Sequence, residues 1–211
     1  MRTKCGKILI LVAMLSSTAV AGNEANPDAI ELVPLPLPAY FKSDMDHTLP
    51  FDSSSTVVLD CPDAVAVEWL SRHFKEWYGK YAPKVAVGTC TLALKDGDEA
   101  YAVEAGTQGI KIVARTIAGT RWAAYTIRQL AVATRGTATV EGHLLPSLSI
   151  RDVPRLVFRG IHLCWFPETR REQIERVVRL AALLKFNHVV IEPWGTWECC
   201  CCSWNLFRRR W

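Results

Sequence analysis

The side chains best suited to hold a ligand lie at the ends of two predicted strands in the last third of the chain. His162 and Trp165 end the first strand, and Glu192, Trp194 and Trp197 follow the second. Indole rings stack against flat apolar faces, and a carboxylate accepts hydrogen bonds from hydroxyl groups. These five residues are therefore candidate binding residues. The alternative is that they only fill space or anchor loops.

One pair of adjacent carboxylates, Asp98-Glu99, is of the type that can act as acid and base. The pair follows Gly97 in the turn KDGDE, which leads into a predicted strand. A solvated turn is the favoured interpretation, because charged residues are common where a turn meets solvent. No catalytic residue is assigned in this chain.

The eight cysteines do not indicate a metal site. Cys199 to Cys202 are consecutive, and successive side chains of an extended chain point to opposite faces, so they cannot converge on a tetrahedral zinc ion. Cys61 and Cys90 either form a disulfide in an oxidising compartment or remain buried free thiols. The sequence predicts neither a metal nor a cofactor.

The elements that must position the candidate residues are a strand, a helix and a second strand in residues 153–198. Leu156–Cys164 is an apolar run that predicts the first strand. The helix is expected from Thr169 to Phe186, with Glu172 at capping-box spacing. His188–Ile191 is a β-branched run typical of a buried parallel strand. We expect the two strands to be parallel and adjacent, with a right-handed crossover.

The preceding residues, 22–152, are predicted to form a small α/β sandwich of three to five strands and two helices. Its core should include Trp69, Phe74, Trp122 and Leu130. Residues 23–38 are an extended, Pro-rich lead-in. The expected strands are Thr56–Leu59, the segments TCTLAL, AYAVEA and IKIVAR in two hairpins, and Leu148–Arg151; the helices begin after a cap at Asp60 or Cys61 and at Gly119.

Residues 1–21 have the three-part pattern of a cleaved secretory signal, with a basic start, an apolar centre and Ala19-Val20-Ala21 before Gly22. The mature chain is therefore expected to be secreted or periplasmic, without a membrane span. Without this segment and Arg208–Arg210, 19 basic residues remain against 21 acidic ones. That balance argues against a nucleic-acid partner, which requires clustered Lys and Arg.

Two segments resemble the β-N-acetylhexosaminidases of glycoside hydrolase family 20. DEAYAVEAGTQGIKIVARTIAGTRWAAYTIRQL is similar to that family's N-terminal domain, with its E-A-Y strand, G-I-x-I strand and A-G turn before a helix ending Q-L. IRDVPRLVFRGIHLCW is similar to the I-x-D-x-P-R-F-x-x-R-G segment that leads into the catalytic barrel, and a helix ending K-F-N follows it. The resemblance covers about residues 30–197.

The resemblance implies an eight-stranded (β/α) barrel, of which residues 153–198 would be the first strand–helix–strand unit. It also implies removal of terminal N-acetylhexosamine from glycans by a retaining reaction, in which the substrate's own acetamido group is the nucleophile. The family's catalytic Asp-Glu pair ends the fourth barrel strand, and this sequence does not contain it. We therefore expect a truncated, inactive chain, in which the five candidate residues contact an amino sugar and Arg159 has a structural role.

The sequence departs from the family pattern at the strand ends. Cys164 stands where the family usually has Asp, and Pro167 where it has a sugar-binding Arg. Residues 199–211 form an aberrant Cys- and Arg-rich tail, for which a frameshift or a premature end is our hypothesis. Two other functions stay open: a non-catalytic exported module that binds sugars or proteins, and a related barrel glycosidase acting on glucuronides or O-linked N-acetylglucosamine.

Overall fold

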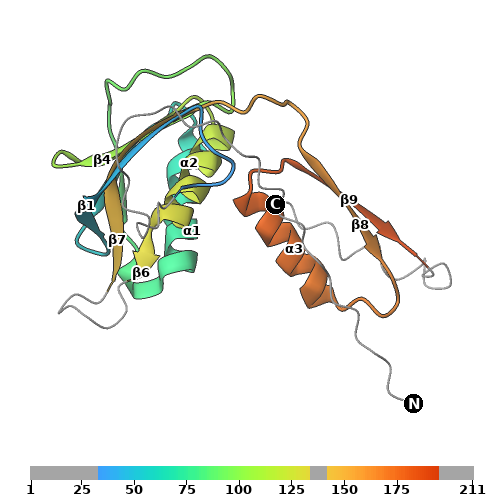
Figure 1. The fold of residues 1–211 in the computed structure, drawn as a ribbon. Coiled ribbons are helices and arrows are strands. Elements are labelled where there is room, and N and C mark those ends of the chain that lie inside the picture. The colour runs from blue at the N-terminus through green and yellow to red at the C-terminus, as the bar shows by residue number, and fades with distance from the viewer. Residues whose placement is uncertain (1–32, 134–141, 195–211) are drawn as a thin grey trace, which may run out of the picture. The chain divides into compact units, whose positions relative to one another are not determined.

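The structure is a computed structural model that describes residues 33–133 and 142–194 (Figure 1). All of these residues belong to one compact unit. The predicted signal segment, the tail from residue 199 and Trp197 lie outside the described residues. No helix in the described part is long and apolar enough to cross a membrane.

Residues up to Asp152 form a mixed sheet with strand order β1-β7-β4-β5-β2-β3, and β6 pairs with β7. Strand β2 is parallel to β3 and β5, and the other neighbours are antiparallel. The strands are β1 Tyr40–Phe51, β2 Thr56–Asp60, β3 Lys84–Val87, β4 Tyr101–Gly106, β5 Gly109–Ala114, β6 Val132–Ala133 and β7 His143–Asp152.

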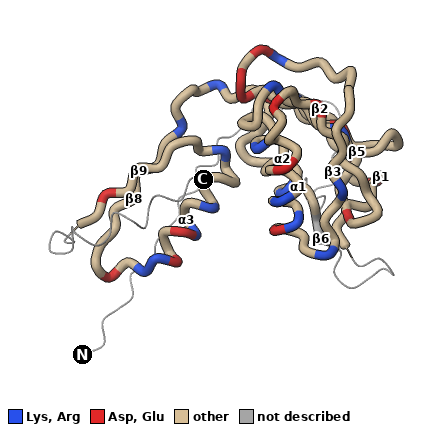
Figure 2. Tube along the Cα trace, turned by 180° about the vertical axis from the view of Figure 1, so that it is seen from behind, with Lys and Arg blue, Asp and Glu red and all other residues tan. Residues whose placement is uncertain are grey.

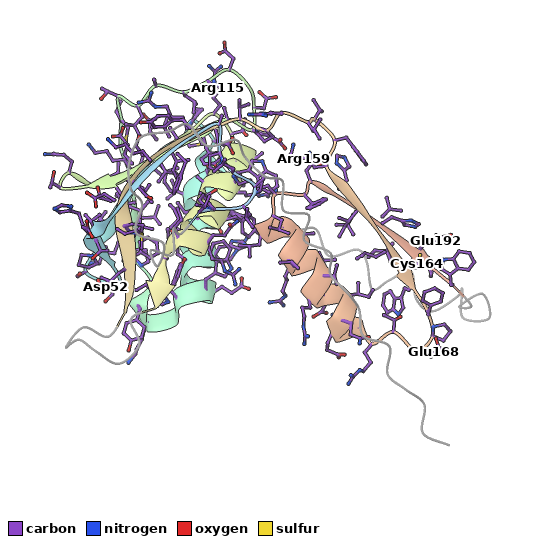
Figure 3. All side chains as sticks on the ribbon, in the orientation of Figure 1. Asp52, Arg115, Arg159, Cys164, Glu168 and Glu192 are labelled. Atoms are coloured by element: carbon purple, nitrogen blue, oxygen red, sulfur yellow. The ribbon has the colours of Figure 1, made fainter. Side chains whose placement is uncertain are left out.

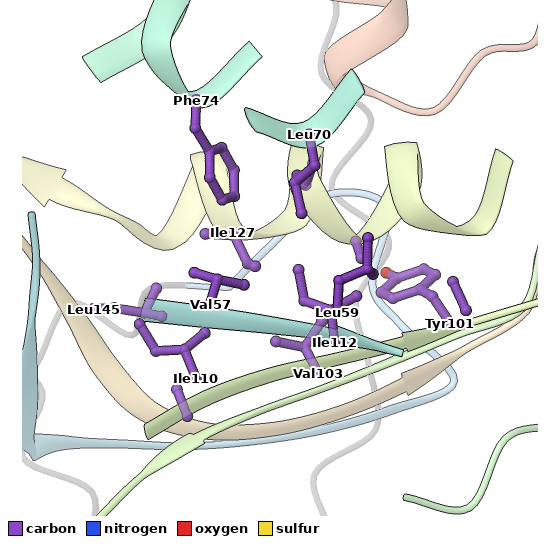
Figure 4. Packing of buried hydrophobic residues seen from close by; sticks show 14 of the residues in the cluster. Val57, Leu59, Leu70, Phe74, Tyr101, Val103, Ile110, Ile112, Ile127 and Leu145 are labelled. Atoms are coloured by element: carbon purple, nitrogen blue, oxygen red, sulfur yellow. The ribbon is translucent and has the colours of Figure 1, made fainter. Parts of the chain in front are cut away.

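Two helices, α1 (Ala64–Tyr78) and α2 (Ile117–Leu130), cover one face of this sheet (Figure 4). Side-chain caps start both helices: the carboxylate of Asp63 accepts from Val65 N, and the hydroxyl of Thr116 accepts from Ala118 N. After α1, Gly79 adopts a φ of +58°, which glycine tolerates without strain, and a short 3₁₀ turn, η1 (Gly79–Tyr81), follows.

The core of the sandwich lies between these helices and the sheet. Trp69, Phe74, Trp122 and Leu130 are all buried, so the predicted core residues are confirmed. The aromatic ring of Phe51 packs edge-on against that of Phe74, with ring centroids 5.6 Å apart. Figure 4 shows the side chains of β2, β4 and β5 meeting those of the helices; the members it labels are Val57, Leu59, Leu70, Phe74, Tyr101, Val103, Ile110, Ile112, Ile127 and Leu145.

Several local predictions for this domain were wrong. TCTLAL is not a strand, because its Cys90 amide bonds to the Asp60 carboxylate, at 2.7 Å, and not to a neighbouring strand. Only one of the two hairpins, β4–β5, therefore forms. The cap of α1 is Asp63, two or three residues after the predicted one, and α2 begins at Ile117, two residues before Gly119. Strands β1, β3 and β6 were not predicted, so the sheet has seven strands and not three to five. Cys61 and Cys90 are free thiols.

The strand–helix–strand unit consists of β8 (Gly160–Trp165), α3 (Arg171–Leu183) and β9 (His188–Pro193). The strands are parallel and adjacent, with Gly160 opposite His188 and Cys164 opposite Glu192, as predicted. Strand β8 starts later than expected, because Leu156–Phe158 are exposed and unpaired with any described strand. The handedness of the crossover stays a prediction.

Helix α3 is also shorter than predicted. It begins at Arg171, and its cap is the Gln173 side chain, which accepts a hydrogen bond from Arg170 N at 3.1 Å. Thr169 instead accepts from Phe166 N within the preceding loop. Both charge signs occur along the helix (Figure 2), and Arg171 pairs with Glu175 one turn later at 2.6 Å.

The end of α3 forces a lysine into an unusual backbone conformation. Phe186 N bonds to Ala181 O and Lys185 N bonds to Ala182 O, which is the Schellman arrangement. The residue at this turn has a positive φ, which glycine usually supplies; here it is Lys185, with φ +63°. Such a conformation costs a non-glycine residue roughly 1 kcal/mol or more. A compensating interaction of the Lys185 side chain is therefore expected.

Candidate functional site

Alternation along β8 and β9 separates their side chains into two faces. His162 and Cys164 are exposed, whereas Ile161, Leu163 and Trp165 are half-buried. In the parallel register Cys164 lies directly opposite Glu192, so both belong to the exposed face (Figure 3). This face, which extends from His162 in the middle of β8 to the C-terminal ends of both strands, is the candidate functional site.

The centre of this site is a close polar contact between two predicted residues. His162 Nε2 lies 2.9 Å from Glu192 Oε2, and about half of each side chain is accessible to solvent. The imidazole can donate or accept a hydrogen bond, and the carboxylate accepts. The pair therefore presents both kinds of hydrogen-bonding group to a ligand, which is what a hydroxyl-rich molecule requires.

An aromatic pair follows the two strand ends. The rings of Phe166 and Trp194 are nearly parallel, at 26°, with centroids 6.4 Å apart. Trp194 is half exposed, and its amide donates to Trp165 O at 2.7 Å, which continues the strand pairing by one residue. An accessible ring two residues beyond Glu192 offers a flat apolar surface beside a polar pair, the combination that suits a sugar.

The other two predicted residues, Trp165 and Trp197, are not seen in this exposed site. Trp165 lies on the half-buried face, and its indole Nε1 donates to Thr169 O at 3.0 Å. The indole thus anchors the loop before α3, which is the structural role that was the alternative to ligand binding. Trp197 lies outside the described residues. The site therefore combines His162, Glu192 and Trp194, but not Trp165.

Sequence reasoning missed two members of the site, Cys164 and Phe166. Cys164 follows His162 by two residues within β8, and side chains at that interval share a face of a strand, whereas Phe166 comes directly after the strand. The strand period was the available signal.

A second polar cluster, which the sequence did not predict, has its side chains in the interior. Lys185 Nζ lies 3.0 Å from Asp152 Oδ2 and 2.6 Å from the Tyr101 hydroxyl. The same hydroxyl lies 2.9 Å from Thr126 Oγ1, and Asp152 also accepts from Ala39 N. Burial lowers the pKa of the Lys185 amine, although Asp152 opposes the change, and burial raises the pKa of the Tyr101 phenol.

An adjoining cluster explains Arg159 and corrects the interpretation of Glu99. The Arg159 guanidinium lies 2.7 Å from Glu99 Oε2, and its Nε donates to Lys185 O at 2.8 Å. The Arg159 amide donates to Asn187 Oδ1 at 2.9 Å. Asp98 and Glu99 do lie in a turn and Asp98 is exposed, but about three quarters of the Glu99 side chain is buried in this ion pair. Arg159 has the structural role predicted for it.

The Lys185–Asp152 and Arg159–Glu99 clusters stabilise the fold and are not candidate catalytic sites. Strongly shifted pKa values often mark active sites, but each charged group here is already paired with another charged group. A hollow of about 380 Å³ lies beside them, lined by residues that include Pro38, Val153 and Leu156. Because Asp152, Arg159 and Lys185 are committed to one another, they leave a ligand in this hollow few polar partners.

Residues 29–153 match the sequence model of glycosyl hydrolase family 20, domain 2. The fold is similar to a family 20 exo-β-N-acetylglucosaminidase from Vibrio harveyi, solved in complex with N-acetylglucosamine (22% identity, TM-score 0.58, 82% of this chain and 28% of that one). It is also similar to the β-N-acetylhexosaminidase of Streptomyces coelicolor (23%, 0.59, 75% and 34%) and to that of Streptomyces plicatus (20%, 0.59, 74% and 33%).

No curated protein matches the chain. The chain spans about a third of the length of the solved structures that it resembles.

Proposed function

Since the chain belongs to glycosyl hydrolase family 20, we propose that it is part of an exported glycosidase of the β-N-acetylhexosaminidase type. Such an enzyme removes terminal N-acetylhexosamine residues from glycans. The observation that carries the proposal is the match of residues 29–153, which span the sandwich from β1 to β7, to domain 2 of that family. Similar solved proteins named as hexosaminidases support it.

In this proposal β8, α3 and β9 are the first unit of a (β/α) barrel. The parallel pairing of β8 with β9 around a helix is the repeating unit of such barrels, and their active sites lie at the C-terminal ends of the strands. Glu192 and Trp194 lie at the C-terminal end of β9, and His162, in the middle of β8, contacts Glu192. They would hold the sugar through hydrogen bonds to its hydroxyls and through stacking on its apolar face.

The proposed reaction is retaining and substrate-assisted. The acetamido oxygen of the substrate attacks its own anomeric carbon, one carboxylate orients the acetamido group, and a carboxylic acid protonates the leaving oxygen. Asp98-Glu99 is the one adjacent Asp-Glu pair in the sequence, and Glu99 is held by Arg159. We therefore expect these 211 residues to bind sugar without hydrolysing it, because general acid catalysis is worth roughly 10² to 10⁴ in rate.

Residues 1–21 support export, since they have the composition of a cleaved signal. Expression in a bacterial host with N-terminal sequencing of the product tests this part separately. Cleavage after Ala21 and recovery outside the cytoplasm are expected. An uncut product that starts at Met1 would contradict export but would leave the glycosidase proposal intact.

The site is tested by titrating N-acetylglucosamine while recording tryptophan fluorescence, alongside an assay with an aryl N-acetylglucosaminide. Glu192→Gln should weaken binding roughly tenfold, because a hydrogen bond to a charged group is worth about 1.5 kcal/mol. Trp194→Ala should also weaken it, because the flat ring on which the sugar stacks is lost. Glu68→Gln, an exposed carboxylate on α1, is the matched control. Turnover by the 211-residue chain that Glu99→Gln abolishes would contradict the proposal.

A second candidate function is sugar binding without catalysis. It is favoured by the exposure of the Phe166–Trp194 pair beside His162 and Glu192, while Glu99 is engaged elsewhere. A longer chain that contains a complete barrel, if the gene encodes one, separates the two functions: turnover favours the glycosidase, and binding alone favours the module. The Glu192 carboxylate would repel the carboxylate of a glucuronide. Under either candidate function, we therefore expect glucuronic acid to bind more weakly than N-acetylglucosamine.

A further inference from the structure

The exposed face of β8 and β9 brings together three side chains that bind metal ions. His162, Cys164 and Glu192 each offer one ligand atom, and these atoms all lie within 4.8 Å of one another. Within the described residues, this is the one group of three or more His, Cys, Asp or Glu side chains placed to share an ion. The cluster comes from two strands that are hydrogen-bonded to each other, so the backbone fixes its spacing.

The strand register explains why the three atoms converge. Cys164 and Glu192 are directly opposite in the parallel ladder, and His162 precedes Cys164 by two residues on the same face. Opposite and diagonal neighbours on one face of a sheet lie close enough for their side chains to touch. The close approach of His162 Nε2 to Glu192 Oε2, at 2.9 Å, is the direct evidence that they do.

The donor set selects the type of ion. Imidazole, thiolate and carboxylate together suit zinc, which takes tetrahedral nitrogen, sulfur and oxygen ligands, whereas calcium and magnesium prefer oxygen alone. Two ligand atoms on one tetrahedral zinc lie about 3.5 Å apart, given zinc–ligand bonds of about 2.0 to 2.3 Å. The observed separations, from 2.9 Å to at most 4.8 Å, bracket that value.

We propose that His162, Cys164 and Glu192 form a binding site for zinc or a similar divalent transition-metal ion. Three protein ligands leave the fourth tetrahedral position open to water or to a ligand hydroxyl, which is the pattern of an accessible rather than a closed site. Partial exposure of His162 and Glu192 gives an ion a route in, and lets both side chains adjust by a few tenths of an ångström. This proposal does not rest on the proposed glycosidase function.

The first experiment measures protection of individual thiols in the full chain. The protein is treated with iodoacetamide with and without zinc ions, and alkylation of each cysteine is followed by peptide mass spectrometry. Bound zinc should slow alkylation of Cys164 by at least about tenfold, because a coordinated thiolate is not available to react. Cys61 and Cys90 are free thiols away from the site and serve as internal controls. The readout is specific to each residue, so the four consecutive cysteines do not interfere.

The second experiment measures the ion itself, in a background where Cys199 to Cys202 are all serine. Cobalt added to this protein should produce a near-ultraviolet charge-transfer band from a thiolate ligand, and zinc should displace it. Cys164→Ser should abolish the band, whereas Cys90→Ser should leave it unchanged. His162→Ala and Glu192→Ala should weaken cobalt binding at least 10- to 100-fold, since loss of even an outer partner of a metal site costs that much.

Two results would overturn the proposal. One is alkylation of Cys164 that zinc does not slow, and the other is a cobalt band that persists in Cys164→Ser. Circular dichroism of each variant separates loss of the site from loss of the fold; the exposed positions of His162 and Cys164 make the latter unexpected. Sugar plays no part in either experiment, so failure here leaves the proposed function untouched.

Discussion

The β-branched strands of the sandwich and those of the β8–β9 pair have similar composition but opposite surroundings. Val57 and Ile112 are completely buried in the seven-stranded sheet, whereas Val189 and Val190 in β9 are 39% and 53% exposed. Helices α1 and α2 cover the sandwich sheet (Figure 4), but among the described residues β8 and β9 pair only with each other. Composition makes a strand possible, and its neighbours determine what it buries.

The two regions also differ in how they use charge. Charged residues in the sandwich lie mainly at its surface, whereas Lys185, at the end of α3, is buried against Asp152 and Tyr101. The ion pairs Lys185–Asp152 and Arg159–Glu99 therefore join the strand–helix–strand unit to the sandwich. Apolar packing dominates within the sandwich, and charged hydrogen bonds are prominent where the second unit meets it.

The largest expected difference between the regions comes from removing a phenylalanine ring. Phe74→Ala should lower the free energy of unfolding by about 3 to 5 kcal/mol, because it leaves a cavity in a close-packed core. Phe158→Ala, before β8, should cost less than about 0.5 kcal/mol, because that ring is 64% exposed. Guanidinium chloride unfolding followed by circular dichroism measures both. Equal losses would show that the two regions are packed alike.

A somewhat smaller effect should follow from removing the buried amine. Lys185→Met leaves Asp152 charged and buried, which costs about 3 kcal/mol, the low end for a broken buried pair. The low end applies because the Tyr101 hydroxyl and Ala39 N still donate to Asp152. The double variant Lys185→Met with Asp152→Asn should recover part of the loss, and Lys42→Met, at an exposed position in β1, is the control. If Lys185→Met lowered the free energy of unfolding no more than Lys42→Met, the Lys185–Asp152 ion pair would not stabilise the contact between the two regions.

The second ion pair should contribute less. Glu99→Gln removes the charge that faces Arg159 and should cost about 1 to 2 kcal/mol, because both side chains are mostly buried. Asp96→Asn is a matched control: its carboxylate lies 2.6 Å from Arg115, but it is almost fully exposed, so less than about 0.5 kcal/mol is expected. Thermal unfolding of both variants makes the comparison. An equal cost would mean that burial does not strengthen the inner pair.

The smallest expected effect is a pH dependence confined to the sandwich. Burial lowers the pKa of His73 and of His143 below the ordinary value of about 6.5. Between that value and the lowered one the unfolded chain binds more protons, so stability should fall as the pH drops below about 6.5. Replacing both histidines by glutamine should flatten this slope in urea unfolding experiments from pH 7.5 to 5. If the slope of stability against pH did not change, titratable groups other than these two histidines would cause the pH dependence.

Much of the local structure followed from the sequence alone. Apolar periodicity located both helices of the sandwich, its four named core residues and the parallel β8–β9 pair, because hydrophobic spacing and strand composition act over a few residues. The same local rules missed strand β1, which pairs along β7 about a hundred residues later. The same rules wrongly predicted a strand at TCTLAL, because an alternating pattern does not show whether a neighbouring strand is present to pair with it.

The roles of the charged motif residues were decided by the tertiary structure. The sequence marked out E-A-Y, I-x-D-x-P-R and K-F-N as family-like segments, and their members Glu99, Tyr101, Asp152 and Lys185 prove to be the residues that join the two regions. Sequence spacing could not show this, because Lys185 lies 84 residues from Tyr101 and 33 from Asp152. The convergence of His162, Cys164 and Glu192 likewise required the register of two strands separated by a helix. Residue type determines which interactions a side chain can make, and only the folded chain determines which partner lies within reach.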